Sequence, residues 1–228
     1  MKTWIWAPVL LFSSWAAFGQ YNGNKEMRHH GMLHIVEYEL PINGSPYVDE
    51  LYKKGTITIE NPQGTLVEEK LMRFNAFTGD MEYLSEGTAR ALLKRENITV
   101  TLGDLVYEVH PYKVRGEIFR AYFNPLNAKD QKVVLFQRPL KHFRKPKMPD
   151  HGYEDAREPE YFDASTYYLS IDGAAMVEVT LNKRDLLRNL EAHRSELAAF
   201  IEDNDLNLRK LSDAVAVVNY YNSLEALN

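Results

Sequence analysis

Apolar and polar residues alternate with a period of two along much of the segment 55–181, a pattern typical of β-strands with one buried face. The alternation recurs over residues 118–123 and 133–136, which the polar loop 124–130 separates. Several short strands at close spacing predict a mostly antiparallel sheet that is curved or sandwich-like. The clearest apolar series are Ile57 and Ile59, Met72 and Phe74, Ile98, Val100 and Leu102, and Leu105, Tyr107 and Val109.

Turn-forming residues separate these apolar series. The stretch Asn61-Pro62-Gln63-Gly64 is typical of a β-turn, because proline presets the backbone at the first central position. Further reversals at Thr78-Gly79-Asp80 and Gly103-Asp104 predict that the first strands form a meander. A hairpin over residues 167–181 is predicted to turn at Asp172-Gly173.

The C-terminal part of the chain has a helical period instead. Asn182 suits the N-cap of a helix, with Asp185 three positions later. Amphipathic helices are predicted over 183–203 and 208–224, and we expect the pair to pack on one another and on the sheet. Because strands come first and helices last, the pattern predicts an α+β fold. The predicted inward positions are Leu186, Leu190, His193, Leu197, Phe200 and Ile201 in the first helix, and Leu211, Val215, Val218 and Tyr221 in the second.

Residues 137–164 interrupt the strand pattern and are predicted to form a long, charged surface loop, because prolines punctuate two runs of charge. The basic run could dock an anionic partner, or it could pair with the acidic run. The basic run is Arg138, Lys141, Arg144, Lys145 and Lys147, and the acidic run is Glu154, Asp155, Glu158, Glu160 and Asp163.

The N-terminus matches a secretory signal peptide over residues 1–19. Lys2 supplies the positive charge, and the apolar run 4–15 is shorter than the roughly twenty residues of a membrane-spanning helix. Small residues at Ala17 and Gly19 predict cleavage between Gly19 and Gln20. We therefore expect a periplasmic or secreted protein, with an N-terminal arm and first strand over 20–54, a β-rich domain over 55–181 and a helical segment over 182–228.

Composition narrows the class of partner. The net charge of −5 argues against nucleic acid as a partner. The chain has no cysteine, so disulfides and a lipid anchor on cysteine are excluded. We expect no transmembrane segment after signal-peptide cleavage, because no later stretch is long and apolar enough to span a bilayer.

No sequence motif singles out a catalytic, cofactor-binding or metal-binding residue. His29, His30 and His34 are the most ligand-like cluster, but strand or arm geometry would split their side chains across faces, so we interpret them as solvated histidines. The acidic run 154–163 lacks the spacing of a calcium loop. We expect His193 at the edge of the core. The aromatic residues of the strands are expected to pack the sheet or, alternatively, to line a concave face that binds an apolar or sugar ligand.

A resemblance adds to this picture. Three stretches resemble a family of exported proteins from Bacteroidetes-type Gram-negative bacteria: LMRFNAFTGDMEY over 71–83, FIEDNDL over 200–206 and VNYYNSL over 218–224. The likeness extends over roughly residues 55–224, and its motifs are not chemically specific. The family has no assigned activity, so the resemblance implies a cell-envelope location and no catalytic residues. It would also make the glycosylation sequon at Asn97 irrelevant.

These observations leave three functional hypotheses. The preferred one is a non-enzymatic cell-envelope protein that binds a partner protein or a ligand through its sheet and the 137–164 segment. The second is a hydrolase that acts on an envelope polysaccharide with paired carboxylates, whose pairing in space a sequence does not reveal. The third is a periplasmic carrier that holds an apolar molecule in a curved sheet.

Overall fold

The computed structural model describes residues 41–147 and 157–226. All of them belong to one unit, Glu39–Asn228. The predicted signal peptide and residues 20–40 of the predicted N-terminal arm and first strand lie outside the described residues. Among the described helices, none is long and apolar enough to cross a membrane.

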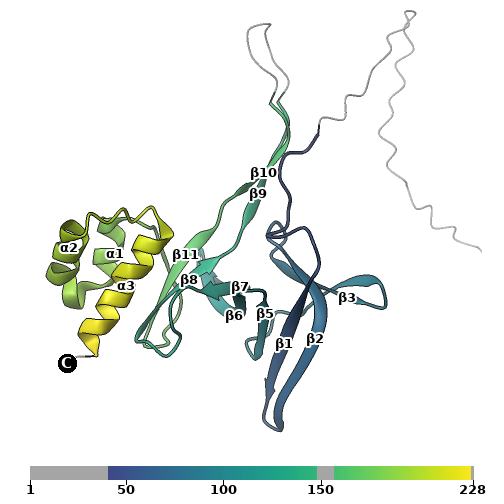
Figure 1. Cartoon of the computed structure of the whole chain (residues 1–228), viewed down its shortest axis with the longest axis horizontal. Helices are drawn as coiled ribbons and strands as arrows, with labels where there is room; N and C mark the ends of the chain where they lie inside the picture. The colour runs from purple at the N-terminus through teal and green to yellow at the C-terminus, as the bar shows by residue number, and fades with distance from the viewer. Residues whose placement is uncertain (1–40, 148–156, 227–228) are drawn as a thin grey trace, which may run out of the picture. The chain divides into compact units, whose positions relative to one another are not determined.

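Ten strands of the described residues form one antiparallel sheet, in the spatial order β12-β11-β8-β7-β6-β5-β1-β2-β3-β4 (Figure 1). Helices follow at the C-terminus, so the predicted α+β fold is confirmed. The strands are β1 (Lys53–Asn61), β2 (Gly64–Asn75), β3 (Asp80–Ser85), β4 (Thr88–Ala91), β5 (Ile98–Leu102), β6 (Leu105–Val114), β7 (Glu117–Pro125), β8 (Val133–Arg138), β11 (Thr166–Ile171) and β12 (Val177–Val179).

The predicted turns join neighbouring strands. Asn61 pairs with Gly64 at the β1–β2 hairpin, so this β-turn is confirmed. The turn between β11 and β12 is also confirmed: Asp172 and Gly173 have positive φ angles of 51° and 70°. Such angles suit the tight hairpin turns whose twist matches the flanking strands, and glycine adopts them without strain.

The sheet curls so strongly between β2 and β7 that side chains from distant strands meet. The rings of Phe74 on β2 and Tyr122 on β7 have centroids 5.8 Å apart, although four strand spacings, roughly 19 Å on a flat sheet, separate these strands. The space inside the curl is filled by buried side chains, which we call the curl core. Its members are Ile57, Met72, Phe74, Ala76, Met81, Ile98, Val100, Tyr107, Val109 and Tyr122.

The same face of the sheet continues from the curl to a second core under the helices. Asn124 pairs with Gln137 across β7 and β8, so the register places Tyr122 and Leu135 on one face. Aliphatic residues of β8, β11 and β12 pack there against the helices and form what we call the helix core. Its buried members are Val133, Leu135, Leu169, Val179, Leu186, Leu187, Leu190, Leu197, Ile201, Leu208, Ala214, Val217, Val218 and Tyr221.

The helical segment differs from the prediction in two ways. It forms α1 (Lys183–Asn189), a short 3-10 turn η1 (Glu191–His193), α2 (Arg194–Asp203) and α3 (Leu211–Glu225), because the backbone leaves helical geometry at Leu190, with φ −115° and ψ 51°. Leu211 and Val215, predicted to face inward, are only half-buried, whereas Ala214 and Val217 are fully buried. The N-cap prediction is confirmed, since the Asn182 side chain accepts a hydrogen bond from the Asp185 backbone N–H at 2.8 Å.

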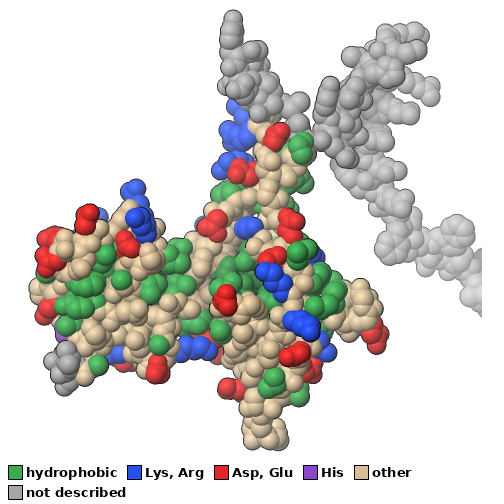
Figure 2. Space-filling view, in the orientation of Figure 1, with side chains coloured by type: hydrophobic (Ala, Val, Ile, Leu, Met, Phe, Trp, Pro, Cys, Tyr) green, Lys and Arg blue, Asp and Glu red, His purple; other side chains and the backbone are tan. Residues whose placement is uncertain are grey.

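Part of the segment 137–164, predicted to be a loop, forms a two-stranded ribbon. Strand β9 (Lys141–Arg144) pairs with β10 (Glu160–Asp163). The two runs of charge meet across it, because Arg144 forms an ion pair with Glu160 at 2.9 Å, and the rings of Phe143 and Tyr161 pack 4.9 Å apart. Figure 2 shows Lys and Arg side chains gathered along this ribbon. The strand signal was hidden because the apolar positions are few and lie between charges.

Candidate functional site

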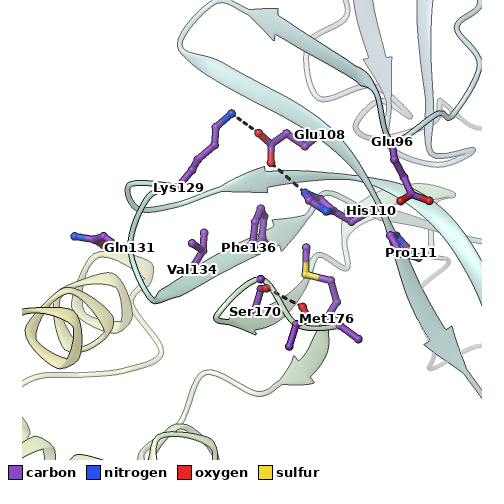
Figure 3. A pocket seen from close by; sticks show the side chains of 13 residues that line it. Glu96, Glu108, His110, Pro111, Lys129, Gln131, Val134, Phe136, Ser170 and Met176 are labelled. Atoms are coloured by element: carbon purple, nitrogen blue, oxygen red, sulfur yellow. Dashed lines mark hydrogen bonds and ion pairs between the residues drawn. The ribbon is translucent and has the colours of Figure 1, made fainter. Parts of the chain in front are cut away.

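A pocket lies on the sheet face opposite the two cores (Figure 3). We call it the Glu108 pocket. It encloses about 510 Å³. Strands β6, β8 and β11 form its floor, and the segments 129–131 and 173–176 form its walls. Its lining residues are Glu96, Glu108, His110, Pro111, Lys129, Gln131, Val134, Phe136, Ser170, Gly173, Ala174, Ala175 and Met176.

A partly buried carboxylate occupies the polar side of this pocket. Glu108, whose side chain is 15% exposed, lies between the side chains of His110 and Lys129. One of its oxygens is 3.0 Å from Nε2 of His110, and the other forms an ion pair with Lys129. Burial acts to raise the pKa of Glu108, but the hydrogen bonds from His110 and Lys129 outweigh it and lower the pKa. Glu108 is therefore a charged anchor at neutral pH.

An aromatic cluster beneath the pocket holds His110 in place. The imidazole ring packs edge-on against Phe136, with centroids 5.1 Å apart, and against Phe123 at 6.0 Å. Phe123 is fully buried beneath neighbouring rings, and Met176 packs on the same cluster. Because these contacts restrict the ring, His110 keeps its orientation without a bound ligand. The cluster consists of Tyr112, Ala121, Phe123, Val134, Phe136 and Tyr168.

The polar groups of the pocket differ in how much hydrogen-bonding capacity remains. The Gln131 carbonyl oxygen accepts hydrogen bonds from Asn127 and Asn222, and the Ser170 hydroxyl donates to the carbonyl oxygen of Ala174 at 2.8 Å. Lys129 has three N–H donors and its side chain is 51% exposed. His110 uses only Nε2 among the described residues. Within the described ranges, the pocket's uncommitted donors are therefore on Lys129 and on the side-chain NH2 of Gln131, and His110 keeps one free ring nitrogen.

This arrangement offers little of what hydrolysis requires. The Ser170 hydroxyl is bonded to a backbone carbonyl rather than to His110, so the pocket has no activated nucleophile of the serine–histidine type. Glu96, the second carboxylate, forms an ion pair with Arg120 at 2.8 Å. A glycosidase acid needs a raised pKa, whereas every carboxyl group with a resolved shift among the described residues has a lowered pKa. These are Asp49, Asp80, Glu108, Glu196, Glu202, Asp213 and Glu225.

The residues singled out in the sequence lie elsewhere. His29, His30 and His34 are outside the described residues, as are Glu154 and Asp155. Within the described ranges no cluster of three or more His, Cys, Asp or Glu side chains is suited to a metal ion.

His193 lies at the edge of the helix core, as predicted. Its side chain is 14% exposed, Nε2 is 3.1 Å from a carboxylate oxygen of Glu225, and its ring packs edge-on against Tyr221. These contacts give the histidine a structural role between η1 and α3.

The residues of the Glu108 pocket were not predicted from the sequence to form a site. The period-two pattern of β6 does place Glu108 and His110 together on the face opposite Tyr107 and Val109, and this was the one available signal. Lys129 belongs to a loop, and its approach to β6 is set by tertiary structure. Comparison with protein-family models, with curated proteins and with solved structures finds no match.

Proposed function

We propose that the protein is a non-enzymatic, exported protein of the cell envelope that binds an amphipathic ligand with an acidic head group in the Glu108 pocket. The observation that carries this proposal is the pairing of uncommitted donors on Lys129 with an apolar wall. Export rests on the predicted signal peptide.

The chemistry of the pocket favours an anionic head on an apolar body. The ammonium of Lys129 keeps donors beyond the one that meets Glu108, and these suit a carboxylate or phosphate oxygen. Val134, Phe136 and Met176 offer an apolar surface to the rest of the ligand. Since Glu108 already neutralises one positive charge, we expect modest affinity that depends on both halves of the ligand.

The alternative hypotheses have weaker support. A carrier of a purely apolar molecule would need an empty interior in the curved sheet, but the curl core is filled by its own side chains, among them Met72, Met81 and Val100, which are fully buried. A hydrolase that cleaves a polysaccharide with paired carboxylates would need one carboxylic acid that stays protonated near neutral pH, which the lowered pKa of Glu108 does not favour.

A matched pair of ligands tests the proposal. Octanoate and octanol share an apolar chain and differ in the charged head. We expect octanoate, titrated to millimolar concentration, to shift the methyl NMR resonance of Met176, and octanol to bind about tenfold more weakly. Lys129→Gln should reduce the affinity for octanoate to that for octanol.

The control variant is Lys132→Gln. Lys132 pairs with Glu225 and does not line the pocket, so this variant removes one lysine charge while the pocket stays intact. It should bind octanoate like the unaltered protein. The proposal fails if octanoate leaves the Met176 resonance unchanged, or if both lysine variants weaken binding equally.

A further inference from the structure

A second hollow lies on the face of the sheet that carries the two cores, between them. Two adjoining pockets, of about 340 and 170 Å³, share Val48, Leu105 and Tyr107 as lining residues. We call their union the Tyr107 groove. Val48 and Leu105 are apolar side chains that remain 43% and 42% exposed there. The groove therefore offers apolar walls over a floor formed by the sheet.

The hydroxyl of Tyr107 is an unused polar group at the floor of this groove. Tyr107 is 1% exposed, and its ring packs 5.0 Å from that of Phe74. Burial alone raises the pKa of Tyr107 to about 12, and within the described ranges its hydroxyl has no hydrogen-bond partner. Among the described residues, the one fully buried side-chain oxygen or nitrogen without a hydrogen-bond partner is Oγ1 of Thr166. The unpaired Tyr107 hydroxyl therefore reaches the solvent in the groove, where it is available to a ligand.

Two amides at the narrower end of the groove are also underused. Asn124, only 3% exposed, donates from its amide nitrogen to the Val106 carbonyl oxygen at 2.6 Å. Its own side-chain oxygen accepts no hydrogen bond from the described residues. Gln137, its partner across β7 and β8, lines the same pocket and has no side-chain hydrogen bond to any described residue. Together with Tyr107 they present both donors and acceptors.

The charged groups of the groove, in contrast, are committed elsewhere. Lys141 donates to the backbone carbonyl oxygens of Ser45 and Tyr47 at 2.8 and 2.6 Å. Asp163 accepts a hydrogen bond from the Ser165 hydroxyl at 2.7 Å, and Asp49 forms an ion pair with Lys53. Asp104 lies on an exposed turn at the far end. Asp163 keeps further acceptor sites, which suit hydroxyl donors and repel an anionic ligand. The groups on the floor of the narrow end, Tyr107, Asn124 and Gln137, are neutral.

We infer that the Tyr107 groove binds a neutral, polyhydroxylated ligand, with one sugar ring placed over Tyr107, Asn124 and Gln137. Each sugar hydroxyl both donates and accepts, which matches a phenol and two amides. The apolar face of a pyranose ring suits Val48 and Leu105, and the wider pocket leaves space for a neighbouring sugar. This inference does not depend on the Glu108 pocket, which lies on the opposite face of β6.

The test uses side-chain amide NMR with four neutral trisaccharides: maltotriose, cellotriose, xylotriose and tri-N-acetylchitotriose. Titrated to millimolar concentration, at least one should shift the side-chain amide resonances of Asn124 and Gln137 together. Tyr107→Phe removes only the hydroxyl and should weaken that binding about threefold to tenfold. Gln137→Met, which keeps the side-chain length, should weaken it similarly.

The control is Tyr122→Phe, an identical change in the same core. The Tyr122 hydroxyl donates to the Leu92 carbonyl oxygen and does not line the groove, so the affinity for the trisaccharide should be unchanged. The inference is overturned if no neutral trisaccharide shifts the two amides, if Tyr107→Phe binds as tightly as the unaltered protein, or if the acidic tri-galacturonate binds more tightly than every neutral probe.

Discussion

The curl core and the helix core lie on one face of one sheet, yet they are closed in different ways. The curl core needs no second layer, because the strands bend until large side chains such as Phe74, Tyr107 and Tyr122 meet. The helix core lies against three helices and is mostly Leu and Val. Wide rings and flexible methionines span the distance between curled strands, whereas branched aliphatic side chains fill the shorter gap between helix and sheet.

The two cores also differ in which groups complete the backbone hydrogen bonds of the sheet. Strand β8 pairs with β7 only at two residues near its end, so Val133 has no strand partner on that side. The side chain of Asn222 on α3 replaces it, accepting from the Val133 N–H and donating to the Val133 carbonyl oxygen, each at 2.8 Å. The helix core is therefore held to the sheet by directional hydrogen bonds as well as by apolar contact, which specifies the position of α3.

The largest effect should follow loss of the ring at the centre of the curl. Phe74→Ala is expected to lower the free energy of unfolding by about 4 kcal/mol, because it leaves a cavity between strands that meet only through their side chains. Leu197→Ala, in the helix core, should cost about 3 kcal/mol. Urea denaturation of both variants measures the difference. A greater loss for Leu197→Ala would show that the helices, rather than the curl, dominate stability.

An intermediate effect is expected at the polar link between α3 and the sheet. Asn222→Leu should lower the free energy of unfolding by about 1 to 3 kcal/mol, because it leaves the buried N–H of Val133 without its partner. The Val133 carbonyl oxygen keeps its hydrogen bond from the Asn127 side chain at 2.9 Å. Asn219→Leu, on the exposed side of the same helix, is the matched control and should change stability by less than about 0.5 kcal/mol. If the two variants are equally stable, water replaces Asn222 and the link is not specific.

The smallest effect distinguishes the two tyrosines of the curl core. Tyr122→Phe should cost about 0.5 to 1 kcal/mol, because the hydroxyl closes the curl through a 3.4 Å hydrogen bond to the Leu92 carbonyl. Tyr107→Phe should leave stability unchanged, since its hydroxyl has no partner in the described part of the chain. Thermal unfolding of both variants is the measurement. An equal loss in the two would mean that the Tyr107 hydroxyl already has a partner within the fold.

The sequence predicts the residues of the curl core more fully than those of the helix core. The alternation of Met72 with Phe74 and of Tyr107 with Val109 identifies the inward face of each strand, because period-two patterns are local. The break at Leu190 and the rotation of α3 follow from tertiary packing, which a helical period does not encode. The ribbon was missed because its pairing depends on contacts between charged and aromatic residues far apart in the chain.

The two candidate sites were even harder to predict from the sequence. Glu108 and His110 share a strand face, and that much is visible in the sequence. Lys129 and Met176 reach the pocket from separate loops. The spare hydrogen-bonding capacity of Tyr107 or Gln137 becomes visible only when every neighbour is known, because it is defined by missing partners.

Strand β6 serves both sides of the sheet at once. Its successive residues alternate between Tyr107, on the side of the groove, and Glu108, on the side of the pocket. Inserting or deleting a single residue between Leu105 and His110 would exchange the two sets and bury a carboxylate in the curl. Insertions and deletions in this part of β6 should therefore disrupt both sites at once, whereas substitutions near Val114, at the exposed end of the strand, should be tolerated. Related proteins are thus expected to keep both sites or to lose both.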